Sequence, residues 1–232
     1  MNEKKVSFAN MICESAIKNE IFLKEGENAC KSFKLIIDIW DYCFEVEVEC
    51  MKSHYTLLWS TLLHVVQPRL YGMIIALLLG DIPACYIFMR LILEGVIDSV
   101  IATTRFPDLQ FPQNMNKLKE LEREKRLSFA EKCKLLLPAW ANSVINDCIK
   151  LWNYLSNYWV HAPGIIKVIL KKFKEYAEST KEKIAIPPMW GLALPYTYDK
   201  EDIKELEELA KHLEKLYKII RKLLDPYKAK TN

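Results

Sequence analysis

Apolar residues recur at steps of three and four along almost the whole chain, which is the spacing of amphipathic helices. Residues 44–49 instead alternate apolar and polar, as a half-buried strand does. No turn signal bounds this stretch, and the helical spacing continues on both sides of it, so we predict a helix there. The pattern as a whole predicts an all-α fold, a single-domain bundle of about seven to nine helices over residues 1–232.

The most apolar part of the chain, residues 57–102, is expected to form a buried central hairpin. Pro68 and residues 80–83 interrupt it, and the piece between them is too short to cross a bilayer core of about 30 Å. The following segment, 82–105, is long enough, but it carries Arg90, Glu94 and Asp98 at mid-depth. Arg and Asp each cost roughly 2.5–3.5 kcal/mol at the centre of a membrane helix. We therefore expect the hairpin of a soluble bundle and no membrane contact.

Local signals place several helix starts. Asp81 is suited to cap the helix over 82–105. Ser128 with Glu131 matches the capping box that opens a helix. Pro68 fits the first turn of a helix that restarts after an interruption.

The last predicted helix, residues 199–225, carries an apolar seam with alternating steps of three and four, typical of about three heptads. Two interpretations of the seam are open: it packs on its own domain, or it forms a contact in a homodimer. Its members are Ile203, Leu206, Ala210, Leu213, Tyr217, Ile220 and Leu224.

Composition narrows the function classes. The chain is 51% apolar and 27% charged, which excludes disorder, and six glycines among 232 residues favour helices over turn-rich β architecture. A net charge of +3 is too small to indicate nucleic-acid binding by itself. The seven cysteines form no CxxC pair and no cluster with zinc spacing, so buried reduced thiols are expected. The N-terminal stretch lacks the apolar core of a signal peptide, which makes the cytoplasm the expected location.

No motif for a metal, a nucleotide cofactor or a serine nucleophile occurs. The sequence lacks HExxH, GxGxxG, a phosphate loop and a GxSxG elbow. We therefore expect neither a metal site nor a cofactor.

Arg90, Glu94 and Asp98 are spaced four residues apart, so they form one charged stripe on an otherwise apolar helix. A buried charge costs several kcal/mol unless it is paired. The stripe therefore needs side chains that pair with its charges, or a functional role. A second apolar segment, 151–164, includes His161, which could supply one.

Two short motifs carry a resemblance to a known group: Arg90-x-x-x-Glu94, and Ser156-x-x-x-x-His161 on a later helix. Over residues 55–164 the chain resembles the HEPN-like helical bundles of prokaryotes. The resemblance implies an all-α bundle that often dimerises and, in many members, acts as a metal-independent ribonuclease in defence or toxin systems. Those nucleases have an arginine four to six residues before the histidine, whereas residues 155–160 of this chain contain none.

If the resemblance extends to catalysis, His161 would act as general acid or base for attack of a ribose 2′-hydroxyl on the adjacent phosphate. Arg90 would hold the phosphate oxygens, and Glu94 would orient its guanidinium. RNA would then be the partner. The competing interpretation is that Arg90 and Glu94 form an internal ion pair, satisfied by His161, which pins one helix arrangement without catalysing any reaction.

Five further residues belong to this hypothetical site as binding groups. Ser156 and Asn157 lie within one turn of His161 and could set its tautomer, Asp98 extends the charged stripe, and Lys167 and Lys171 could attract phosphate. A small-ligand pocket is a third interpretation of the same residues. The function that we expect is an interaction or structural module of a prokaryotic accessory or defence system, and the alternative is a ribonuclease.

Overall fold

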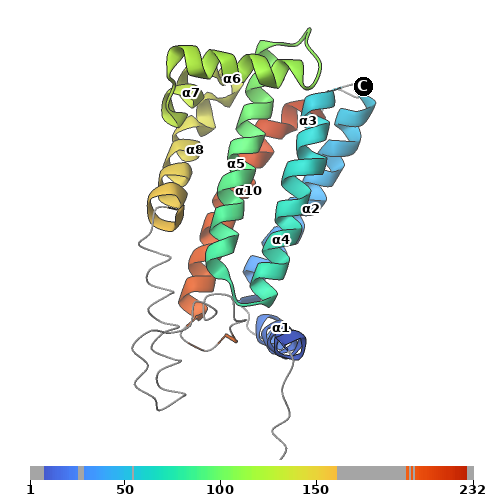
Figure 1. Ribbon diagram of the computed structural model, residues 1–232, viewed down its shortest axis with the longest axis vertical. Coiled ribbons are helices and arrows are strands. Elements are labelled where there is room, and N and C mark those ends of the chain that lie inside the picture. Colours follow the sequence, from blue (N-terminus) through green and yellow to red (C-terminus); the bar gives the residue numbers. More distant parts are fainter. Residues whose placement is uncertain are drawn as a thin grey trace, which may run out of the picture.

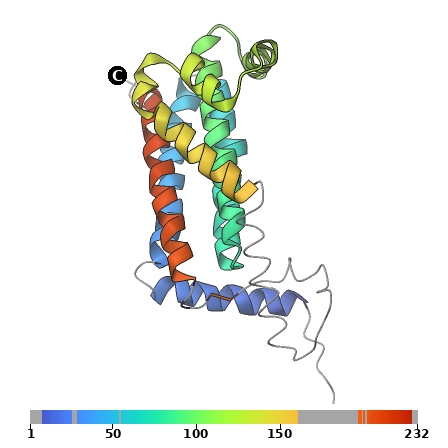
Figure 2. The same ribbon diagram turned by 90° about the vertical axis from the view of Figure 1, so that its left-hand side faces the viewer.

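The computed structural model describes residues 8–25, 29–53, 55–160, 197–198, 200 and 202–228. These residues form helices joined by short turns and contain no strand, so the predicted all-α bundle is confirmed. Long helices stand side by side in Figure 1: α2 (Ala29–Lys52), α4 (Gln67–Leu78), α5 (Ile82–Arg105) and α10 (Ile203–Lys228). Helix α1 (Phe8–Glu25) crosses their lower ends, nearly perpendicular to them (Figure 2).

Helix α2 includes the alternating residues 44–49, as predicted. Its inward side is set by the three-and-four spacing of Ile36, Ile39, Cys43, Val46 and Cys50, all fully buried. The spacing extends well beyond the alternating stretch, so burial along the whole helix outweighs the local strand-like pattern.

The structure corrects the expected interruption at Pro68. Helix α3 (Thr56–Thr61), the π-helical turn η1 (Leu62–Val66) and α4 form one continuous rod through this proline. Proline lacks an N–H and its ring clashes with the preceding turn of an α-helix, and the wider π-helical turn just before it accommodates both defects. Residues Thr56–Leu78 therefore form a single helix of 23 residues, and among the described residues it alone is long and apolar enough to cross a membrane. Core helices of soluble bundles pass the same test.

Helix α5 lies at the centre of the bundle and packs on α4 as the second arm of the predicted buried hairpin. Asp81 caps it as predicted, because its carboxylate accepts from the Ala84 backbone N–H at 3.2 Å. The two arms approach closely at glycines. A Cβ at Gly95 would lie 2.8 Å from Cγ1 of Val65.

A smaller helical layer covers the upper part of α5 (Figure 1). It contains α6 (Gln113–Lys125), α7 (Phe129–Leu136), the short 3-10 turn η2 (Ala139–Ala141), α8 (Asn142–Tyr154) and the π-helical turn η3 (Leu155–Val160). The capping box predicted at Ser128 and Glu131 opens α7. Helix α8 then descends along α5 and α10.

The seam of α10 is buried inside its own chain. Leu206, Leu213, Ile220 and Leu224 are fully buried, and α10 packs mainly against α2. Of the two interpretations of this seam, the structure supports docking on its own domain, because the apolar residues that a second copy would need are already covered.

The cysteines behave largely as the sequence predicts. Five of the six whose side chains are described are buried free thiols, and Cys13 is exposed. Burial raises the pKa of Cys43 and of Cys148 to about 12, so these thiols stay protonated and unreactive at neutral pH.

Candidate functional site

The lower half of the charged stripe is a paired network between α5 and α8. The Arg90 guanidinium donates from Nε to Oε1 of Glu94 at 3.0 Å. The indole Nε1–H of Trp152, on α8, donates to the same oxygen at 2.6 Å. Arg90 also lies over the Trp152 ring, 5.1 Å from its centroid, so a cation–π contact closes the triangle. Each of the three side chains therefore contacts the other two.

The upper half of the stripe is paired with the smaller helical layer. The Lys132 ammonium, on α7, lies 2.5 Å from Oδ1 of Asp98 and 2.9 Å from Oε1 of Glu122, on α6. Burial by itself would lower the pKa of Lys132, but the two carboxylates outweigh it and raise the pKa. Burial raises the pKa of Asp98, although the lysine opposes that shift. One ammonium thus serves two carboxylates from two other helices.

These contacts make the stripe a seam between helices. Every charged group on it contacts a residue of α7 or α8. Arg90 and Glu94 contact Trp152 of α8, and Asp98 contacts Lys132 of α7. The Phe129 ring stacks on Trp152 at 4.7 Å between centroids and 9° between planes, which joins α7 to the same seam. Chemically, one oxygen of each carboxylate of the stripe already accepts from a cation.

The remaining predicted site residues divide between buried, exposed and undescribed positions. Ser156 is buried, and its hydroxyl has no hydrogen-bond partner within the described ranges, whereas the neighbouring Asn157 is exposed. These two neighbouring side chains therefore lie in different environments. His161, Lys167 and Lys171 lie outside the described residues. Arg90 meets α8 at Trp152, nine positions before His161 in the sequence.

Sequence reasoning missed the described partners of the stripe, Trp152 and Lys132, and also Glu122, the second carboxylate that Lys132 contacts. The apolar neighbours of Trp152 in the sequence favour a core position and by themselves leave its indole N–H out of account. A buried tryptophan usually has a hydrogen-bond partner, so this N–H was the available signal. Nothing in the sequence marks Lys132 among the other surface-like lysines.

Within the part of the chain that the structure describes, no three His, Cys, Asp or Glu side chains gather as metal ligands would. We find no family model, curated protein or solved structure that matches the chain. The contacts described above are therefore the basis for any statement about function.

Proposed function

We propose that this chain is a HEPN-like helical module that works by protein–protein contact and not by catalysis, within a prokaryotic accessory or defence system and in the cytoplasm. The observation that carries the proposal is the pairing of the α5 stripe. Arg90 and Glu94 contact each other and Trp152, and their side chains are only 21% and 29% exposed. A catalytic arginine needs its guanidinium available to the substrate, whereas a structural arginine is satisfied within the fold.

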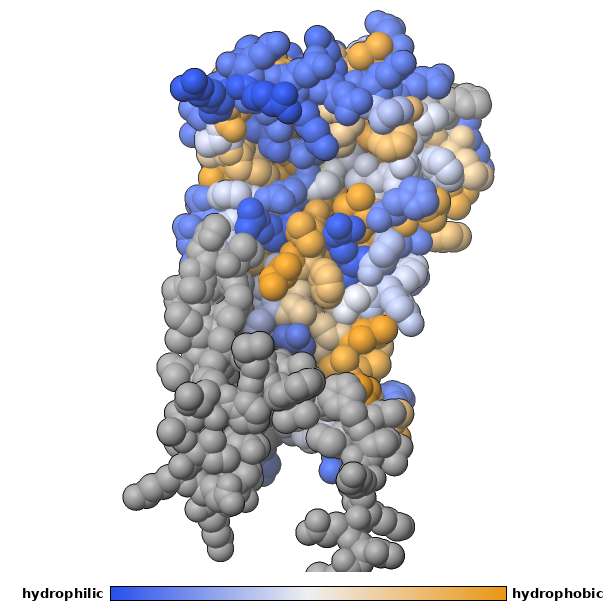
Figure 3. All heavy atoms as spheres, in the orientation of Figure 1, coloured by the Kyte–Doolittle hydropathy of each residue, from blue (hydrophilic) through white to orange (hydrophobic). Residues whose placement is uncertain are grey.

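An exposed apolar surface supplies the candidate contact. Large apolar side chains lie exposed on adjacent helices, and we call this set the apolar face: Tyr71 and Ile75 of α4 with Ile87 and Leu91 of α5. Figure 3 shows hydrophobic side chains running down this side of the molecule, over α4 and α5. Apolar patches of this kind mark surfaces that bind another macromolecule.

A second copy of this chain is the partner that we propose for the apolar face. A two-fold contact places the same patch of both copies against itself, so an apolar patch is complementary to its own copy. The seam of α10 cannot serve this purpose, because its apolar residues are buried against α2. The dimer expected from the resemblance therefore requires another surface.

Sedimentation analysis of the purified protein tests the proposed dimer. We expect a dimer that Leu91→Lys and Tyr71→Lys convert to a monomer, since each places an ammonium group in the contact. Leu135→Lys is the matched control, because Leu135 is exposed and apolar but lies on α7, away from the apolar face. A wild-type monomer at high concentration, or a chain that sediments with lipid vesicles and not with itself, would contradict the proposal.

A ribonuclease assay on the same preparations tests the alternative. We expect no RNA cleavage by the wild-type chain. If it cleaves RNA, and His161→Ala abolishes the cleavage without lowering the melting temperature, then the catalytic interpretation replaces ours. Folding of each variant is checked by far-UV circular dichroism.

A further inference from the structure

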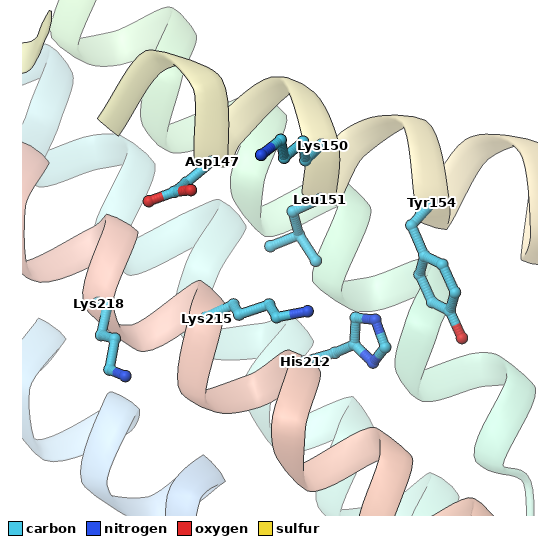
Figure 4. A pocket seen from close by; sticks show the side chains of 7 residues that line it. All are labelled: Asp147, Lys150, Leu151, Tyr154, His212, Lys215 and Lys218. Carbon is cyan, nitrogen blue, oxygen red and sulfur yellow. The ribbon is translucent and has the colours of Figure 1, made fainter. Parts of the chain in front are cut away.

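A groove between α8 and α10 is separate from the charged stripe and from the apolar face. Its volume is about 340 Å³, within the range of small-molecule sites. Its walls come from one face of each helix: α8 contributes residues at steps of three and four, from Asp147 to Tyr154, and α10 contributes His212, Lys215 and Lys218 (Figure 4).

The deep part of the groove is apolar and aromatic. Leu151 and His212 are buried, and the His212 ring stacks on Tyr154 with 4.0 Å between centroids and 11° between planes. Nδ1 of His212 lies 2.8 Å from the Glu208 carbonyl, and as an N–H it donates there. In the neutral ring the other nitrogen, Nε2, then keeps its lone pair.

The rim of the groove is basic. Lys150 of α8 and Lys215 and Lys218 of α10 line it, against a single lining acid, Asp147. In Figure 4 the Lys215 side chain runs along the groove, and its ammonium group ends beside the His212 ring. None of the three lysines has an ion-pair partner within the described part of the chain, whereas Lys211, one turn earlier on α10, pairs with Glu208 at 3.3 Å.

The three unpaired lysines that line the groove repel one another, and an anion bound there offsets that repulsion. Three ammonium groups and one carboxylate leave two positive charges, which a phosphate dianion neutralises. Lysine binds phosphate as a point charge without needing a fixed fork geometry. The buried Leu151 behind the rim offers apolar contact to the rest of a ligand.

We propose that the groove between α8 and α10 binds a small organic phosphate, with its phosphate between Lys150 and Lys215 and its apolar part against Leu151. Lys218 lies on the same rim and adds to the positive field. This proposal is independent of the dimer and of the α5 stripe, because it uses neither set of residues.

Isothermal titration calorimetry at fixed ionic strength tests the groove, with inorganic phosphate and phenyl phosphate as probes. We expect saturable binding of both, tighter for phenyl phosphate because its ring covers Leu151. Lys215→Gln and Lys150→Gln should each weaken binding about tenfold, which corresponds to about 1.4 kcal/mol. Lys222→Gln is the matched control, since Lys222 is an exposed lysine of α10 that does not line the groove.

Three results would overturn the proposal. One is the absence of saturable binding of either probe. Another is an equal loss with Lys222→Gln and Lys215→Gln, which would indicate general attraction to a basic helix. The third is tight binding of an RNA oligonucleotide that Lys215→Gln weakens while neither small probe binds, which would make the groove part of a nucleic-acid surface.

Discussion

Replacing Trp152 with phenylalanine tests the role of the α5 stripe most directly. The substitution removes the indole N–H that Glu94 accepts at 2.6 Å and keeps an aromatic ring to stack on Phe129. A hydrogen bond to a charged group contributes about 1.5–3 kcal/mol. Because the Glu94 side chain remains 29% exposed, water replaces part of the lost bond. We therefore expect the free energy of unfolding to fall by about 1–2 kcal/mol, or roughly 2–8 °C in melting temperature for a chain of this size.

A double-mutant cycle separates the hydrogen bond from the lost volume of the indole. Urea unfolding is measured for the wild type, Trp152→Phe, Glu94→Gln and the double variant. We expect a coupling energy of about 1 kcal/mol between the two positions, since the residues are in contact. Trp140→Phe is the control: Trp140 is exposed on η2, so its free energy of unfolding should change by less than about 0.5 kcal/mol. Additive single effects would refute the assignment of the stripe as a structural network.

Four other substitutions have expected effects on stability or on its pH dependence. Gly95→Ala should destabilise the chain by about 1–2 kcal/mol because the new Cβ meets Val65 at 2.8 Å. In a Val65→Ala background the same change should become stabilising, since alanine exceeds glycine in helix propensity by up to about 1 kcal/mol. Thermal melts of the four proteins test this. Lys132→Met should cost roughly 3 kcal/mol in urea unfolding because it leaves two part-buried carboxylates without a cation, whereas Asp98→Asn should cost less than about 1 kcal/mol because Lys132 keeps Glu122. Burial lowers the pKa of His212, against the opposing hydrogen bond to Glu208, so its contribution to stability is present above about pH 6.5 and is lost as the pH falls. His212→Phe should therefore flatten the fall in melting temperature between pH 7.5 and pH 5.5, and an unchanged slope would contradict the assignment.

Most helices could be predicted because their signals are local. The three-and-four spacing of α2 and the caps at Asp81 and Ser128 depend on residues within one or two turns. The continuous rod through Pro68 was not predictable in this way. A proline normally interrupts a helix, and only the π-helical turn at Leu62–Val66, packed against α5 and α2, shows how this one is accommodated.

The site was only half predictable, for a related reason. The Arg90–Glu94 pair follows from a spacing of four on one helix. The contacts with Trp152 and Lys132 depend instead on the register between α5 and the smaller helical layer, which the packing of distant segments sets. The expectation that His161 meets the stripe concerns a residue outside the described ranges, and the described contact of Glu94 with α8 is made by the indole of Trp152.

The pKa of Asp98 indicates what the stripe contributes. Lys132 lies 2.5 Å away and favours the charged carboxylate, yet the pKa is raised, because burial, together with the nearby carboxylates of Glu122 and Glu94, disfavours that charge. A group with a raised pKa contributes stability below its unfolded value, near pH 4, and loses it as the pH rises. At neutral pH the Asp98 carboxylate therefore adds little net stability, although removing its cation is costly. Such a pair serves to select one register of α7 on α5, because any sliding of these two helices separates Lys132 from Asp98. An Asp98→Leu/Glu122→Leu/Lys132→Leu triple variant, which leaves no carboxylate of the cluster unpaired, should therefore remain about as stable as the wild type while showing broader amide signals for α7 in NMR spectra. A large loss of stability in that variant would show that the pair itself holds the layer in place.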